Sequence, residues 1–289
     1  MISSRREALF AMAGAAVGAP RMLPLAICNE TFAGMSFYET CTAARRIGYT
    51  GLEVDASTLG PDPVALTAAQ RNAHRRMMED AGLQFVGFHS FLKAPSGLHL
   101  TTPDAKIREK SWNYFADLIE LCASLGPGPL MVLGSGKQRS GNGTAHLTEG
   151  LARMAAIAAK HGVTILLEPL SPQFTDNVNT LAQAKAIVQK IDSPNLRTML
   201  DTHNLVAETE SAAALLRGQG DLIRHIHLNE MDGRYPGSGT YPFAPLLQAT
   251  RDSKYSGWLS VEVFDFKPDG ETVARRSFDF IRQIERSLK

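Results

Sequence analysis

"SWNYFADLIELCASLGPGPLMVLGS", residues 111–135, contains the pattern that decides the fold. Its first part carries apolar side chains at the three- and four-residue spacing of one helix face: Trp112, Phe115, Ile119 and Cys122. Glycines and prolines then interrupt the helix, and the short apolar run "PLMVL" that follows is typical of a buried strand. A helix that leads at once into a buried strand predicts a parallel sheet whose strands are connected by helices.

The same alternation extends outward in both directions. Eight apolar runs are strand-like: "PLAICN", "GLEVD", "QFVGFH", "PLMVLGS", "VTILLEPL", "LRTMLDTHN", "LIRHIHLNE" and "WLSVEVF". Helical patterns follow them over residues 36–47, 63–81, 103–125, 145–161, 181–191, 211–217, 243–252 and 272–287. Eight strand–helix units over residues 23–289 predict a single (β/α)8 barrel, a fold of about 250 residues. A doubly wound open sheet is the alternative, but "CNETFAGMS" lacks the nucleotide-binding glycine motif expected after its first strand.

Composition limits the classes of partner. The 289 residues carry a formal net charge of +1 and are 44% apolar, as in ordinary globular proteins. The balanced charge gives no reason to expect a nucleic-acid partner, and no stretch is apolar enough to span a membrane. The three cysteines, an odd number, predict buried thiols and no disulfide framework.

The N-terminal stretch "SSRREALFAMAGAAVGAP" has a different character. Arg5 and Arg6 precede a short run rich in alanine, glycine and methionine, which indicates a twin-arginine export signal over residues 1–22. We therefore expect an exported, periplasmic protein. A disordered or helical extension on a cytoplasmic protein is the alternative.

The ends of the predicted strands carry polar groups. In a (β/α)8 barrel these ends form the functional face. They read, in order, Asn29 with Glu30, Glu53, His89, Ser135, Glu168, Asp201, His227 and Glu262. Eight such ends on one rim predict a functional site there.

The last four strands give the sharpest set of candidates: Glu168, Asp201, His227 and Glu262. Each follows the previous one by about one strand–helix unit, so the four side chains are expected on adjacent strands. Three carboxylates packed together repel one another, which raises their pKa values. A divalent cation removes that repulsion. Three oxygen ligands and one imidazole favour Mn²⁺, with Mg²⁺, Co²⁺ and Zn²⁺ left open.

In these motifs the chain resembles the sugar isomerase/epimerase group of xylose isomerase-like TIM barrels. The group contains ketose 3-epimerases, hydroxypyruvate isomerases and inosose dehydratases. The resemblance covers most of the chain after residue 24 and rests on "LLEPL", "LDTHN", "HIHLNE…PGSG" and "VEVF". It also accounts for "GLEVD" and for His89, which is expected to bind the substrate.

The resemblance implies a small sugar or keto-polyol as the substrate and a mechanism through an enediolate. A metal ion bound by the four candidates would acidify the C–H next to the substrate carbonyl. Glu168 and Glu262 would act as the acid and the base. His203 and Arg234 are expected to grip substrate oxygens.

Several residues keep two interpretations. Glu53 would contact the substrate, support a ligand or form a structural ion pair. Glu230 would contact the substrate at the rim or support a ligand. His225 would be a hydrogen-bonded core histidine. "GSGKQRSGNG", residues 134–143, is interpreted as a flexible loop at the rim. "EPLSPQFTDN" lacks the arginine and glutamate usual in ketose 3-epimerases, so Asp176 or Asn177 would have to substitute. His203 also stands one place earlier than the histidine of those enzymes.

Other functions remain open at this point. A lyase that dehydrates an inosose or 3-keto sugar would use the same proton abstraction. A non-catalytic sugar-binding barrel is a further alternative, and the two glutamates argue against it. An AP-endonuclease would need more histidine ligands and a basic face, which the sequence does not supply. A homo-oligomer, either a dimer or a tetramer, is also left open.

Overall fold

The computed structural model describes residues 22–288, so the predicted signal segment lies outside the described residues apart from Met22. The strands are β1 (Leu25–Cys28), β2 (Gly51–Asp55), β3 (Gln84–His89), β4 (Leu130–Leu133), β5 (Thr164–Leu167), β6 (Leu196–Asp201), β7 (Ile223–Leu228) and β8 (Trp258–Val261). The helices are α1 (Phe37–Ile47), α2 (Ala68–Asp80), α3 (Ala105–Leu125), α4 (Thr144–His161), α5 (Leu181–Ile191), α6 (Ala212–Gln219), α7 (Phe243–Asp252) and α8 (Gly270–Ser287).

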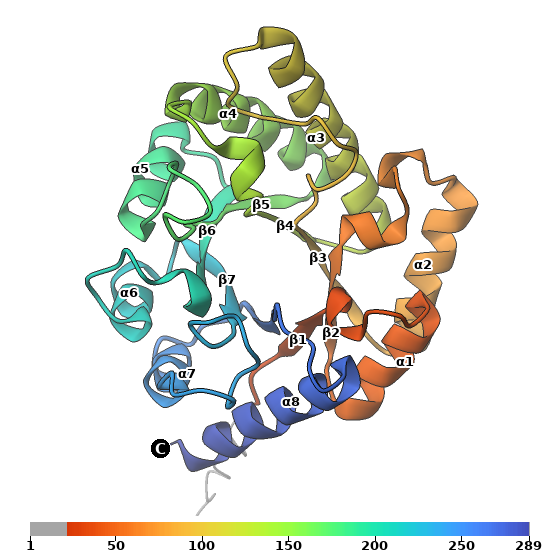
Figure 1. Ribbon diagram of the computed structural model, residues 1–289, viewed down its shortest axis with the longest axis vertical. Helices are drawn as coiled ribbons and strands as arrows, with labels where there is room; N and C mark the ends of the chain where they lie inside the picture. The colour runs from red at the N-terminus through yellow and green to blue at the C-terminus, as the bar shows by residue number, and fades with distance from the viewer. Residues whose placement is uncertain (1–21, 289) are drawn as a thin grey trace, which may run out of the picture.

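The eight strands form a closed parallel barrel in chain order, and the helices form a ring around it (Figure 1). Closure is direct, because Ile27 of β1 pairs with Leu52 of β2 on one side and with Val261 of β8 on the other. The predicted (β/α)8 barrel is confirmed and the open-sheet alternative is wrong.

Helix starts are set by capping side chains. Ser36, Thr67 and Thr180 each form a reciprocal capping box with the residue three positions later. The helix predicted over 63–81 is therefore split. A short 3-10 turn (Pro63–Ala65) comes first, and α2 begins only after the cap at Thr67.

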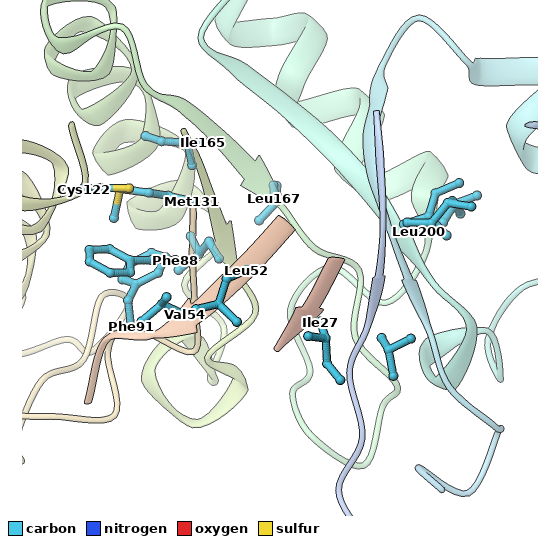
Figure 2. Close-up of a cluster of buried hydrophobic side chains, with 14 of the residues drawn as sticks. Ile27, Leu52, Val54, Phe88, Phe91, Cys122, Met131, Ile165, Leu167 and Leu200 are labelled. Atoms are coloured by element: carbon cyan, nitrogen blue, oxygen red, sulfur yellow. The ribbon is translucent and has the colours of Figure 1, made fainter. Parts of the chain in front are cut away.

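Successive residues of each strand face opposite sides of the barrel wall, as the pleat requires. The residues facing the helices join one large apolar core, which Figure 2 shows around Met131, Ile165 and Leu167. The residues between them, Val132, Leu166 and Met199, form a small apolar cluster of their own.

Side chains of β2 and β7 add a group of polar residues to the interior. Glu53, His225 and His227 are at most 1% exposed. Buried charge is tolerated only where it is paired, so these three residues mark the part of the barrel that holds the functional side chains in place.

Two predictions about composition are also answered. Over residues 22–288 no helix combines the length and the apolar character needed to cross a membrane. The three cysteines are buried free thiols, as predicted.

Candidate active site

Four side chains meet at the carboxyl ends of neighbouring strands. They are the predicted ligands, and their donor atoms all lie within 4.8 Å of one another: Glu168, Asp201, His227 and Glu262. Glu168 directly follows β5 and Glu262 directly follows β8, while Asp201 ends β6 and His227 lies in β7. Parallel strands place these ends at one rim, and all four side chains are buried there.

The orientation of His227 is fixed by a carboxylate below it. Its Nε2 lies 3.1 Å and 3.2 Å from the two oxygens of Glu53, which accept a hydrogen bond from its Nε2–H. Its Nδ1 faces the cluster and lies 3.0 Å from Oε2 of Glu262. A buried imidazole nitrogen that faces carboxylates has the arrangement of a metal ligand supported from behind by a carboxylate.

The electrostatics of the cluster support the same interpretation. Burial, then the neighbouring charges of Asp201 and Glu262, raise the pKa of Glu168 well above its ordinary value. Burial and the charge of Glu262 likewise raise the pKa of Asp201. Burial acts in the same direction on Glu262, but the charge and hydrogen bond of His227 and the charge of His89 together outweigh burial and lower its pKa. A divalent cation would relieve the repulsion, so three carboxylates and one imidazole fit such an ion.

Two further groups of ionisable side chains lie beside this cluster. One contains Cys28, Glu30, His89 and Glu262, and the other contains Cys28, Glu53 and His227. Burial, followed by the charges of nearby glutamates, raises the pKa of the Cys28 thiol well above its ordinary value. Glu30 and His89 already pair with each other at 2.6 Å. The cluster of three carboxylates and His227 is therefore the better candidate metal site.

Asn204 was not among the predicted site residues, yet it joins two of the ligands. Its amide Nδ2 donates to Oδ2 of Asp201 at 2.5 Å and to Oε1 of Glu168 at 3.3 Å. It ends a 3-10 turn, Thr202–Asn204, that begins directly after Asp201. One 3-10 turn brings residues three apart close together, so the spacing of Asp201 and Asn204 in "DTHN" could have predicted this contact.

The loop predicted to be flexible is anchored by a buried arginine. Arg139 is 0% exposed, and its guanidinium donates to the carbonyl oxygens of Gly134, Asn177 and Glu168 at 2.6–2.7 Å. Asp176 in turn accepts from the backbone N–H of Gly141. These bonds, which the interpretation as a flexible loop did not anticipate, tie the loop after β4 to the loop after β5. Asp176 and Asn177 both accept hydrogen bonds that connect the two loops.

Gly134 leaves room for the first ligand. A Cβ at this position would overlap Oε2 of Glu168. The glycine therefore lets Glu168 lie against the end of β4.

The five predicted substrate residues lie at different depths. His89 is at the cluster, with Nε2 4.0 Å from Oε1 of Glu262. Glu53 lies one layer lower, hydrogen bonded to both His225 and His227, which favours a supporting role over substrate contact. His225 is, as predicted, a hydrogen-bonded core histidine.

The other three belong to the rim. The ring of His203 lies between Phe174 and Phe264, with centroid distances of 5.6 and 5.2 Å, and its Nδ1 is 2.8 Å from the carbonyl oxygen of Met231. The structure places Glu230 and Arg234 outside the cluster. Glu230 accepts from the N–H groups of Gly237 and Tyr241, and Arg234 is paired with Asp232 on the exposed loop after β7.

The comparison with known proteins agrees with this geometry. Residues 41–284 match the family described as xylose isomerase-like TIM barrel. The chain belongs to this family. Among xylose isomerase-like barrels with curated names, a probable ketose 3-epimerase of Synechocystis sp. is 25% identical over 83% of this chain and 88% of its own. The D-psicose 3-epimerase of Enterocloster bolteae is 26% identical over 82% and 79%.

Solved structures show the same fold. An L-ribulose 3-epimerase superposes with a TM-score of 0.79 at 20% identity, over 92% of this chain and 95% of its own. The 3-keto-D-glucoside 4-epimerase of E. coli gives 0.78 at 19% identity, over 91% and 100%. The curated relatives of this xylose isomerase-like barrel are epimerases, so the predicted class of enzyme, an isomerase, is confirmed.

Proposed function

We propose that this protein is a divalent-metal-dependent sugar epimerase or isomerase that moves a proton on the carbon next to a carbonyl. The observation that carries the proposal is the four-residue cluster, in which glutamates from β5 and β8 lie on either side of Asp201 and His227. The ketose 3-epimerases among its relatives support a small sugar or keto-polyol as the substrate.

The cluster residues would hold the ion through three carboxylates and Nδ1 of His227. A bound divalent ion, Mn²⁺ first and Mg²⁺, Co²⁺ or Zn²⁺ as alternatives, would supply Lewis-acid polarisation of the substrate carbonyl. Glu168 and Glu262 would then exchange the proton with the substrate carbon, one removing it and the other returning it.

The contacts of the two glutamates suit these roles. Oε2 of Glu262 faces His227, while its Oε1 comes no closer than 4.0 Å to Nε2 of His89 and is the oxygen with room to take a proton. Asn204 holds Oε1 of Glu168. Glu262 thus has one oxygen held and one oxygen for proton transfer, while in Glu168 Oε1 is held and Oε2 lies against Gly134.

Proton exchange with solvent tests the proposal. The protein is incubated with Mn²⁺ and a ketohexose in D₂O, and deuterium at the carbon next to the carbonyl is followed by NMR. We expect incorporation together with an epimerised or isomerised product, and loss of both in Glu262→Gln. Full activity of Glu262→Gln would overturn the two-glutamate scheme.

The same experiment separates the alternatives. Release of water with a dehydrated product would identify a lyase. Absence of exchange and of product, with no divalent metal retained on purification, would identify a sugar-binding barrel without activity.

A further inference from the structure

A cavity of about 440 Å³ opens beside the metal cluster, on the side of the barrel where β8, β1 and β2 end. It lies within the usual size range of small-molecule sites. Among the described residues that line it, none belongs to the four-residue cluster. They come from the end of β2, from α1 and from the loops after β1, β2, β3 and β8: Asn29, Glu30, Phe32, Ala33, Gly34, Met35, Phe37, Thr40, Asp55, Thr58, Lys93, Val263, Phe264 and Phe266.

The cavity lies next to the cluster, and two sets of residues link them. Glu30 lines it, and Oε1 of Glu30 is 2.6 Å from Nε2 of His89, which is 4.0 Å from Glu262. Val263 and Phe264, which directly follow Glu262, form another part of the lining. A sugar reacting at Glu262 would therefore direct one of its substituents into this cavity.

One wall of the cavity is polar. Lys93 donates to Asp55 at 2.7 Å, and its side chain is 53% exposed, so its remaining N–H groups are open to a ligand. Thr58 accepts from Asn29 at 2.8 Å. A carboxylate, an ammonium, a hydroxyl and an amide in one wall match the alternating donors and acceptors of sugar hydroxyls.

The remaining lining is apolar, and part of it is exposed. Phe264 is 56% exposed and Met35 is 38% exposed, with Phe266 partly buried beside them. Large apolar side chains left exposed around a polar cavity are typical of a ligand site. Aromatic rings offer the flat apolar surface that the C–H faces of a pyranose ring can cover.

We propose that this cavity is a subsite for a second sugar ring, so that the preferred substrate is a glycosylated keto sugar and the free ketose is bound less well. The inference rests on the proposed function, which places the reacting ring at the cluster. The second ring packs its C–H face on Phe266 and Phe264, while its hydroxyls bond to Lys93, Asp55 and Thr58.

Calorimetric titration of the Mn²⁺-loaded protein tests the subsite without requiring turnover. The probes are fructose, isomaltulose (glucosyl on O6 of fructose) and lactulose (galactosyl on O4). We expect at least one disaccharide to bind about tenfold or more tightly than fructose. In Phe266→Ala and in Lys93→Ala that advantage falls severalfold, while Tyr38→Ala, which removes an exposed aromatic side chain on α1 outside the cavity, retains it.

Two results would overturn the subsite. One is that neither disaccharide binds better than fructose. The other is that the advantage is the same in both cavity variants, with melting temperatures showing that each is folded. Deuterium exchange measured in parallel reports separately on the proposed function. A disaccharide preference without exchange keeps the subsite and rejects the chemistry, and exchange without a preference does the reverse.

Discussion

Glu53 and His227 are 174 residues apart in the chain, and in the fold Nε2 of His227 donates a hydrogen bond to Oε1 of Glu53 at 3.1 Å. This contact fixes the ring so that Nδ1 faces the carboxylates of the cluster. Glu53 also accepts from His225 at 2.8 Å, so the carboxylate is held between two histidines. A metal ligand supported in this way binds its ion more tightly than an unsupported one.

Replacing Glu53 by glutamine is therefore expected to weaken Mn²⁺ binding by about 10- to 100-fold. The neutral amide no longer fixes the proton of His227 on Nε2, and Nδ1 becomes a poorer ligand. Calorimetric titration of the metal-free protein with Mn²⁺ measures the effect.

Glu230→Gln is the matched control, because Glu230 is equally buried but accepts only backbone N–H groups in the loop after β7. It should keep the affinity of the wild type. Equal affinities in wild type and Glu53→Gln would mean that His227 does not depend on its partner.

Gly134 gives a second test of the metal site. In Gly134→Ala the new methyl group overlaps Oε2 of Glu168, so this ligand must move. We expect Mn²⁺ affinity to fall about tenfold or more. Gly218→Ala, at a helical glycine with open space around it, should leave affinity unchanged and stability equal or up to about 1 kcal/mol higher. Unchanged Mn²⁺ affinity in Gly134→Ala would show that Glu168 is not a ligand.

The buried guanidinium of Arg139 gives a prediction about stability. A lysine in its place offers no planar fork and cannot reach all three carbonyl oxygens, which leaves buried acceptors without donors. Arg139→Lys should lower the free energy of unfolding by about 2–4 kcal/mol in urea denaturation. Lys137→Ala, an exposed change in the same loop, should stay within about 0.5 kcal/mol. A similarly small effect of Arg139→Lys would contradict the anchoring role.

Glu262 and Arg139 show which functional residues the sequence could predict and which it could not. Glu262 was predictable, because a carboxylate at the end of an apolar strand stands out locally and the closed barrel determines its neighbours. Arg139 lies in a glycine-rich loop with no periodicity. Its burial depends on carbonyl oxygens as far as 38 residues away, which only the folded loops bring together.

The depth of Glu53 was ambiguous for a related reason. The period of two in β2 puts it inside the barrel, but it does not say which layer it occupies. The registers of β7 and β8 relative to β2 settle this, and they are set by the whole barrel. The cavity likewise joins Lys93 of the polar wall and Phe266 of the apolar lining from loops that have no common sequence pattern.

The pair of His89 and Glu30 predicts how stability changes with pH in the metal-free protein. Burial alone would lower the pKa of His89, but the charge and hydrogen bond of Glu30, with help from Glu53 and Glu262, raise it to about 9. An unfolded histidine has a pKa of about 6.5, so the folded state holds the proton more tightly. The contribution to stability is complete below about pH 6.5, declines as the pH rises, and is lost above about pH 9.

Urea denaturation after removal of metal, at several values between about pH 6 and 9.5, measures this window. Wild type should lose on the order of 2–3 kcal/mol more than His89→Gln over that range. His161→Gln, which removes an exposed histidine at the end of α4, should follow the wild type. If wild type and His89→Gln lose stability in parallel, His89 is neutral in the folded protein and its bond to Glu30 is not an ion pair.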